Sequence, residues 1–389
     1  MAFGIGFIDP PTVDADTKVV PSVTVSERYD SNVFYAPQSF VPNQRLWDFV
    51  TVVAPEVKVQ QSSRPIEGDF RVGGSASTYI NNPGLNYYSA NAASHLNLDN
   101  WISQLMERTR LEVDEYFQYT PEQPSFFTPK ADITSAPLLL GIQAFRANSL
   151  FNVARARGSY DLSPTLSVQG SYLNTITRFG RAFVTAGPGA FFSTMTQTAS
   201  AGPQIKLSPR DTASLSYAYS TTEFGDAFGF ATHNISAEYT RYLIPALVAT
   251  MNAGGTQIEP GGTTHVVGKA ALNWLSSQDE RWLLTYNREV TANIFLTAAP
   301  VISQRISAGI VHQFTQRLTM AASANYAFNE TTSAPVFRFT SYGTGIGLTY
   351  LMTRFVSASL QHEYYNYNYA GLTKFDRNTV TFSISATWP

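Results

Sequence analysis

The 389-residue sequence has no cysteine, few charged residues and no long apolar run. Without cysteine, disulfides, thiolate catalysis and Cys-ligated metals are excluded. Charged residues make up only 14% of the chain, whereas they are about a quarter of a typical soluble domain. No apolar stretch reaches the length of about 18 residues that marks a membrane-spanning helix. The formal net charge of −2 argues against a nucleic-acid-binding surface.

Aromatic residues, by contrast, are abundant, with 26 Phe and 21 Tyr in the chain. A chain that is poor in charge and has no helical span leaves two main options. One is a large soluble all-β protein, and the other is a transmembrane β-barrel. In such a barrel, polar lumen-facing residues alternate with apolar lipid-facing ones, so each segment carries only a weak hydrophobic signal.

The C-terminal segment Asn378–Trp388 favours the barrel. In its sequence, NTVTFSISATW, apolar residues occupy every second position from Val380 and hydroxyl residues lie between them. Successive side chains of a strand point to opposite faces. At about 3.3 Å per residue and a tilt of about 40°, a strand of this length roughly crosses one bilayer core. The pattern predicts a strand with lipid on one side and a water-filled lumen on the other.

The same alternation recurs along the chain between two kinds of connection. Short turns such as Leu162–Leu166, Leu207–Asp211 and Leu243–Leu247 lie about 40 residues apart, and a longer connection rich in Gly, Pro, Asn and Thr lies between each pair. Short turns at one end and longer loops at the other are typical of outer-membrane barrels. A solenoid or propeller would also be periodic, but would not need strands of about 10–14 residues.

We therefore predict an all-β fold: one antiparallel, up-and-down transmembrane β-barrel of about 18 strands, formed by residues 18–389 in a bacterial outer membrane. Residues 1–17 are predicted to be a periplasmic arm, and they lack the basic segment of a secretory signal. An aromatic girdle is expected beside the short turns. Its predicted members are Trp101, Tyr160, Trp274, Trp282, Tyr350 and Trp388. Trp101 is expected to begin a long strand that runs to Tyr119.

A barrel of 18 strands would have a backbone diameter of roughly 36 Å and an aqueous lumen. The irregular stretch Thr120–Ala144 is long enough to fold into that lumen, although a disordered surface loop would look the same in the sequence. Charges of both signs are predicted on the lumen wall, where they suit hydrated, weakly charged solutes or simply solvate the wall. The candidate pore-lining residues are Arg71, Arg108, Arg110, Glu112, Asp114, Arg157, Lys269, Arg305 and Glu363.

An enzymatic function is the weaker hypothesis. The five histidines show neither a metal-ligand spacing nor a Ser/His/Asp pattern, so we predict no catalytic site, no metal site and no cofactor. Glu112 and Asp114 are two residues apart on one strand face and could pair for acid–base chemistry. With Arg108 and Arg110 beside them, an internal ladder of ion pairs is the better interpretation.

The segment from Val25 to Pro55 contains Tyr29-Asp30-Ser31-Asn32-Val33, followed by Asp48-Phe49. It resembles the opening of an outer-membrane β-barrel porin family associated with bacterial exopolysaccharide export. The chain ending resembles the barrel-assembly signal, with Phe382, Ile384 and Trp388 as its apolar residues. Pro389 cannot donate a hydrogen bond to a strand ladder, so Trp388 is taken as the functional end.

The resemblance implies a channel that passes hydrophilic solutes or a glycan chain. The alternative is a structural barrel that sheaths or anchors a multi-protein complex of the outer membrane. Expected partners are outer-membrane lipid and lipopolysaccharide, the barrel-assembly machinery, and periplasmic export or complex proteins, but no nucleic acid. A lumen narrowed by a loop would favour transport, and an unobstructed lumen would favour the sheath.

Overall fold

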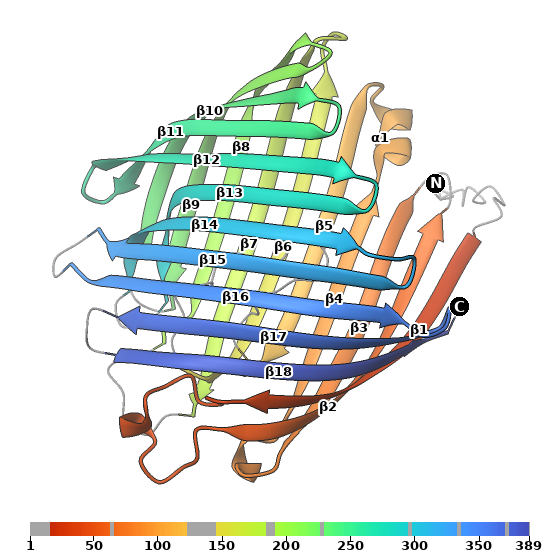
Figure 1. Ribbon diagram of the computed structural model, residues 1–389. Coiled ribbons are helices and arrows are strands. Elements are labelled where there is room, and N and C mark those ends of the chain that lie inside the picture. Colours follow the sequence, from red (N-terminus) through yellow and green to blue (C-terminus); the bar gives the residue numbers. More distant parts are fainter. Residues whose placement is uncertain are drawn as a thin grey trace, which may run out of the picture.

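The computed structural model describes residues 16–62, 66–122, 145–183, 191–225, 229–294, 298–332, 336–369 and 373–388. These residues form one 18-stranded antiparallel sheet in which each strand pairs with its neighbours in the chain (Figure 1). The strands are β1 (Asp16–Asp30), β2 (Asp48–Ser62), β3 (Glu67–Tyr79), β4 (Tyr87–Asn97), β5 (Thr109–Thr120), β6 (Ala147–Asp161), β7 (Leu166–Ala182), β8 (Thr194–Ser208), β9 (Asp211–Phe224), β10 (Gly229–Ile244), β11 (Leu247–Glu259), β12 (Thr263–Ser277), β13 (Glu280–Asn293), β14 (Ala299–Gln313), β15 (Leu318–Thr331), β16 (Arg338–Leu351), β17 (Val356–Tyr369) and β18 (Thr373–Thr387).

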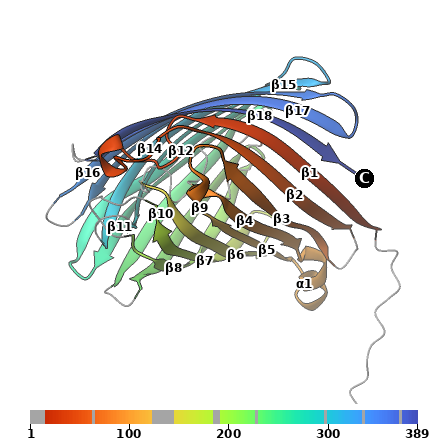
Figure 2. The same cartoon turned by 90° about the horizontal axis from the view of Figure 1, so that it is seen from below.

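The sheet closes between its first and last strands. Strand β1 pairs antiparallel with β18, in a register that runs from Ser22 opposite Thr387 to Asp30 opposite Thr379. Figure 2 shows β18 lying beside β1, at the seam of the closed sheet. Closure leaves no unpaired sheet edge, which is the condition for a β-structure to span lipid. The predicted fold class, an up-and-down barrel of about 18 strands, is confirmed.

The two faces of the strands differ as the alternation predicts. Large apolar side chains are exposed on one face, among them Val72, Leu215, Ile235 and Met251. The opposite face carries hydroxyl groups that bond across neighbouring strands, such as Thr198 to Ser220 at 2.9 Å. An apolar outer belt around a polar interior is the arrangement required when lipid surrounds the barrel.

The two ends of the barrel differ in their connections. At the end that carries both chain termini, the connections 162–165, 209–210, 245–246, 278–279, 314–317 and 352–355 are short (Figure 1). The opposite end carries the long connections 31–47 and 121–146. Short periplasmic turns and longer extracellular loops make the termini end periplasmic.

One predicted strand is wrong in its first part. The strand expected from Trp101 to Tyr119 begins only at Thr109 as β5, and its first residues belong to the short helix α1 (Asp99–Leu105). Apolar residues at Trp101, Ile102 and Leu105 have the spacing of a helix face rather than a strand face. The side chain of Asp99 also accepts the backbone N–H of Leu111 at 2.8 Å, which holds the helix against β5.

Several boundaries lie close to the predicted ones. Strand β1 begins at Asp16, two residues before the expected position, and residues 1–15 of the predicted arm lie outside the described residues. Residues 123–144 of the long irregular stretch also lie outside them, as does Pro389. No helix within the described ranges is long and apolar enough to cross a membrane.

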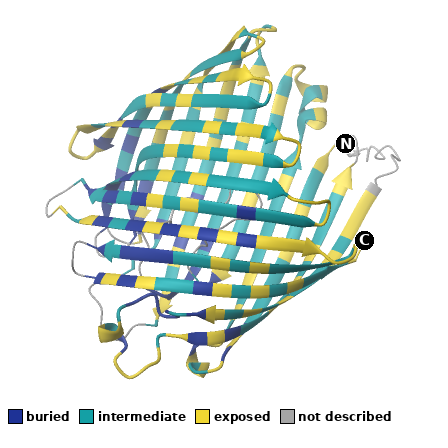
Figure 3. Cartoon of the chain, viewed as in Figure 1, coloured by how far each residue is buried: buried dark blue, intermediate teal, exposed yellow. Residues whose placement is uncertain are grey.

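Buried side chains gather at the extracellular end of β16, β17, β18 and β2 (Figure 3). The cause is the β1–β2 loop (residues 31–47), which contains the short 3-10 helix η1 (Gln38–Phe40). Val33, Phe34, Tyr35 and Ala36 in this loop are at most 1% exposed. They pack with inward-facing residues of the wall, so the loop fills part of the extracellular mouth. The further members of this packed group include Val50, Tyr79, Val301, Phe339, Tyr365, Tyr367, Tyr369 and Phe375.

Candidate functional site

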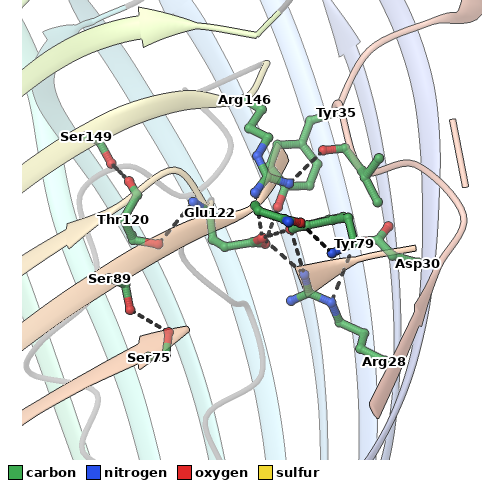
Figure 4. Close-up of polar contacts among 12 residues, drawn as sticks. Arg28, Asp30, Tyr35, Ser75, Tyr79, Ser89, Thr120, Glu122, Arg146 and Ser149 are labelled. Atoms are coloured by element: carbon green, nitrogen blue, oxygen red, sulfur yellow. Dashed lines mark hydrogen bonds and ion pairs between the residues drawn. The ribbon is translucent and has the colours of Figure 1, made fainter. Parts of the chain in front are cut away.

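Beneath the β1–β2 loop lies a cluster of charged and phenolic side chains inside the barrel mouth (Figure 4). Its members, here called the Glu122 cluster, come from three strands and two loops. Arg28 and Asp30 end β1, Tyr79 ends β3 and Arg377 lies on β18, whereas Tyr35, Glu122 and Arg146 belong to extracellular connections.

Glu122 is surrounded by three guanidinium groups. Its carboxylate oxygens lie 3.1 Å from Nη2 of Arg28, 3.3 Å from Nη2 of Arg146 and 3.6 Å from Nη2 of Arg377. Arg377 also forms a two-pronged ion pair with Asp30, with a shortest distance of 2.6 Å. Three cations and two carboxylates therefore share one buried volume, and the geometry ties β1, β18 and two loops together.

The phenols complete the coordination of the Glu122 carboxylate. Tyr79 donates its hydroxyl to Oε1 at 2.7 Å, and the Tyr35 hydroxyl donates to Oε2. Arg146 is fully buried and its guanidinium stacks over the Tyr79 ring, 4.8 Å from the centroid. Arg377 stacks over Tyr35 at 4.4 Å. Buried charge is tolerable only when it is paired and hydrogen-bonded. These contacts pair every charge of the cluster, while Nε of Arg28 and Nε of Arg146 make no hydrogen bond within the described residues.

The Tyr29–Val33 motif explains how the β1–β2 loop turns inward. Asp30 accepts the backbone N–H of Asn32 at 3.0 Å, and the Asn32 side chain donates to the carbonyl of Ala36 at 2.9 Å. Both side chains are at most 3% exposed. Asp and Asn form such local side-chain turns readily. The short polar side chains thus place Tyr35 over the cluster.

The local electrostatics keep the loop residues of the cluster in one ionisation state. Burial acts to raise the pKa of Glu122, but Arg28, Arg146 and Arg377 outweigh it and hold that pKa well below its ordinary value. Burial also raises the pKa of the Tyr35 phenol far above its usual range. At neutral pH, Glu122 is therefore ionised and Tyr35 is a hydroxyl donor.

Below the mouth, the inner face of β2–β6 carries a ladder of ion pairs. The carboxylate of Asp114 pairs with Arg155 at 3.0 Å and with His95 at 2.7 Å. The guanidinium of Arg157 lies 3.0 Å from the Glu112 carboxylate. The pairs sit directly opposite in the β5–β6 register, with Glu112 facing Arg157 and Asp114 facing Arg155. The ladder interpretation of Glu112 and Asp114 fits these contacts.

The inner face of β7–β11 is different, because hydroxyl and amide groups dominate it. Ser171 and Ser200 are 2.7 Å apart, Thr196 and Thr222 are 3.0 Å apart, and Asn234 donates to Thr256 at 2.6 Å. The lumen wall thus carries a ladder of ion pairs on one side and mainly hydroxyl and amide groups on the other. Such a surface offers both kinds of partner to a hydrated solute.

The predicted pore-lining residues do not form one site. Arg110, Glu112, Asp114 and Arg157 come together on the β5–β6 ladder, where Arg110 pairs with Asp161 at 3.4 Å. The others are spread around the barrel, and their role in a pore wall stays a prediction. Arg71 lies opposite Lys58, Lys269 opposite Asn252 and Asn287, Arg305 beside Glu289 at 3.3 Å, and Glu363 opposite Gly345 and Thr379.

Arg108 requires a correction, because it is not on a strand face. It lies between α1 and β5 with a positive φ of 65°, at the periplasmic end. Trp101 likewise lies on α1 rather than on a strand. The three residues of the predicted assembly signal share one face at the end of β18, and their role in assembly stays a prediction. Phe382, Ile384 and Trp388 are 48%, 44% and 51% exposed.

The sequence did not single out Glu122, Arg146, Arg155 or Arg377. Glu122 is a lone acid after Pro121 in an irregular stretch, and its partner Arg28 is 94 positions away in the chain. No local pattern reports such a contact. The one available signal was the Tyr29–Val33 segment, where Asp and Asn precede an apolar run.

No set of three or more His, Asp and Glu side chains is arranged to hold a metal ion within the described part of the chain. His95 and His312 each contact one carboxylate, at 2.7 Å from Asp114 and 3.0 Å from Glu280. His233 contacts Tyr217 at 2.7 Å.

Comparison with known proteins gives a family match for part of the chain. Residues 262–387, from the β11–β12 turn to the end of β18, match the family described as "Putative beta-barrel porin 2". No curated protein matches the sequence. The closed barrel, its apolar belt and this match indicate a porin-like β-barrel of the bacterial outer membrane.

Solved structures of bacterial porins are similar over nearly the whole chain. OpdO of Pseudomonas aeruginosa has 11% identity and a TM-score of 0.48, covering 96% of this chain and 98% of its own. OpdQ of the same organism has 10% identity and a TM-score of 0.46, with 96% and 98% covered. OccK2 (OpdF), solved in complex with glucuronate, has 11% identity and a TM-score of 0.47, with 96% and 99% covered.

Proposed function

We propose that this protein is an outer-membrane channel for hydrophilic solutes whose extracellular mouth is narrowed by the β1–β2 loop. The observation that carries the proposal is the Glu122 cluster, which fixes an extracellular loop against the inner wall instead of leaving it outside. The inner wall below it bears ion pairs and hydroxyl groups rather than apolar side chains. A polar wall under a fixed constriction is the arrangement that a selective aqueous passage needs.

The constriction also bears on the alternative of a structural sheath. A barrel that houses a partner needs a free lumen at its mouth, whereas here Val33–Ala36 pack against β2, β3 and β16–β18. We therefore favour transport over the sheath, and transport over an enzyme. The finer proposal, that the solute is a glycan chain in exopolysaccharide export, rests on the resemblance of the segment Val25–Pro55 alone.

The absence of cysteine allows a direct test of the aqueous path. Thr198 on β8 points inward to Ser220, and its neighbour Ala199 lies on the opposite face, paired with Tyr219. A positively charged methanethiosulfonate reagent, added to single channels in a planar bilayer, is expected to lower the conductance of Thr198→Cys stepwise. Ala199→Cys should be unaffected, because its thiol faces lipid.

Equal responses of the two variants would show that current does not pass along this wall, and would overturn the proposal. Absence of any conductance in the folded protein would move the assignment to the structural sheath. Heat-modifiable migration in gel electrophoresis establishes that each variant is folded before it is measured.

A further inference from the structure

A pocket of about 520 Å³ opens on the extracellular surface of the mouth. Its walls come from the β1–β2 loop, from the β3–β4 connection with the 3-10 helix η2 (Pro83–Leu85), and from the end of β7 with Phe183. Phe34 and Leu85, 1% and 4% exposed, line the pocket and also belong to the packed group beneath the loop. The pocket is therefore the outer surface of the constriction itself.

The polar walls of the pocket are built on one buried carboxylate. Asp48 is fully buried and accepts the backbone N–H groups of Asn81 and Asn82 at 2.9 and 2.8 Å. It also accepts hydrogen bonds from the side-chain Nδ2 groups of Asn81 and Asn82, at 3.3 and 2.9 Å. Asn82 uses both Nδ2 hydrogens, on Asp48 and on the backbone carbonyl of Arg45 at 3.0 Å, so its amide oxygen is what it can offer a ligand.

The charge of the pocket has one sign. Among the described residues that line it, the charged ones are Arg45 and Arg181, and both are exposed. Arg45 is oriented by donating to Asn81 at 3.0 Å and by lying 5.8 Å from the Trp47 ring centroid. Arg181 lies over Phe183 at 5.9 Å. The buried carboxylate of Asp48, behind the two asparagines, already accepts five hydrogen bonds, the fifth from the backbone N–H of Phe49 at 2.8 Å.

We infer that this pocket binds a saccharide that carries an anionic group. Guanidinium groups recognise carboxylate and phosphate by paired charge-assisted hydrogen bonds. Amide oxygens accept sugar hydroxyls, and Phe183 with Pro83 offers apolar surface to a ring face. The volume lies within the range of small-molecule sites, about 300–1,000 Å³. Only the role of this pocket rests on the proposed channel function. In that role, the pocket collects solute at the outer mouth.

The test measures binding in detergent micelles, without a bilayer, so that a failure of conduction counts only against the channel. Trigalacturonate is titrated into the full-length protein, with neutral maltotriose as the matched ligand. The pocket variant is the double substitution Arg45→Gln with Arg181→Gln. The control variant is Arg354→Gln, which removes an exposed arginine that stacks on Phe355 at 4.5 Å near the periplasmic turns.

Trigalacturonate should bind the wild type and Arg354→Gln equally, and the double variant at least about tenfold more weakly. Binding should also weaken as salt rises, because the arginines are exposed. Equal affinity for maltotriose, or unchanged affinity in the double variant, would overturn the inference. Binding of lipopolysaccharide in place of free trigalacturonate would also overturn it, since the site would then serve a lipid.

Discussion

At the scale of single residues, Glu122 holds the β1–β2 loop in place. This carboxylate lies between three guanidinium groups and accepts two phenol hydroxyls. A buried ion-pair group adds little net stability compared with an apolar equivalent, but the removal of one partner is costly because the others stay buried and unpaired. The Glu122 cluster thus specifies one position of the loop more than it adds to overall stability.

Replacement of Glu122 by Gln should release the β1–β2 loop. The change leaves three cations with only Asp30 to balance them, so the free energy that anchors the loop should fall by about 3 kcal/mol. Amide hydrogen exchange of residues 32–36 should accelerate more than about 100-fold. The matched control is Glu330→Gln at the same end, whose partner Arg338 is 67% exposed, and its effect should stay below about 1 kcal/mol. Equal exchange in both variants would contradict the anchoring role of Glu122.

The pH dependence of the loop follows from the lowered pKa of Glu122. A carboxyl with a depressed pKa in the folded state stabilises that state above its unfolded pKa and loses the contribution only as the pH falls through the folded value. Loop exchange, corrected for intrinsic rates, should therefore be the same at pH 8 and pH 5. Release is expected only in stronger acid. A transition between pH 5 and 8 would show that another group controls the loop.

At the scale of the elements, each strand faces lipid on its outer side and water on its inner side. On β18, Phe382 faces outward and Ser383 faces the lumen, where it lies opposite Ser26 and Ser359. Because side chains alternate with a period of two, these adjacent positions face lipid and water respectively, so they tolerate opposite kinds of side chain.

Arginine at Phe382 should impair the barrel, and arginine at Ser383 should not. A charge on the lipid face near the middle of the membrane costs about 2–4 kcal/mol, whereas the lumen hydrates it. The folded fraction, measured as the heat-modifiable band after refolding into liposomes, should fall for Phe382→Arg and stay near the wild-type value for Ser383→Arg. The reverse order would mean that the faces are assigned the wrong way round.

Strands were predictable from the sequence because alternation and turn residues are local signals. The pairing of β18 with β1 also followed, since a closed barrel must join its ends. Helix α1 was missed because the apolar residues around Trp101 were fitted to a strand period. The inward fold of the β1–β2 loop was missed for a different reason. Its anchors Glu122, Arg146 and Arg377 are distant in the chain, and isolated charges carry no local pattern.

At the scale of the whole molecule, the barrel combines a polar wall with a mouth that is narrowed from inside. The wall bears ion pairs of both signs on β2–β6 and hydroxyl groups on β7–β11. Because the charges pair with each other, the passage should discriminate only weakly between small cations and anions. We propose that the β1–β2 loop sets the width of this passage.

Single-channel conductance tests that claim most directly. The wild type is compared in a planar bilayer with a variant in which residues 33–46 are replaced by a short Gly-Ser linker, after both are shown to be folded. We expect a small conductance for the wild type and a several-fold larger, ohmic and weakly selective conductance for the trimmed variant. The same conductance in both proteins would show that the loop does not narrow the path.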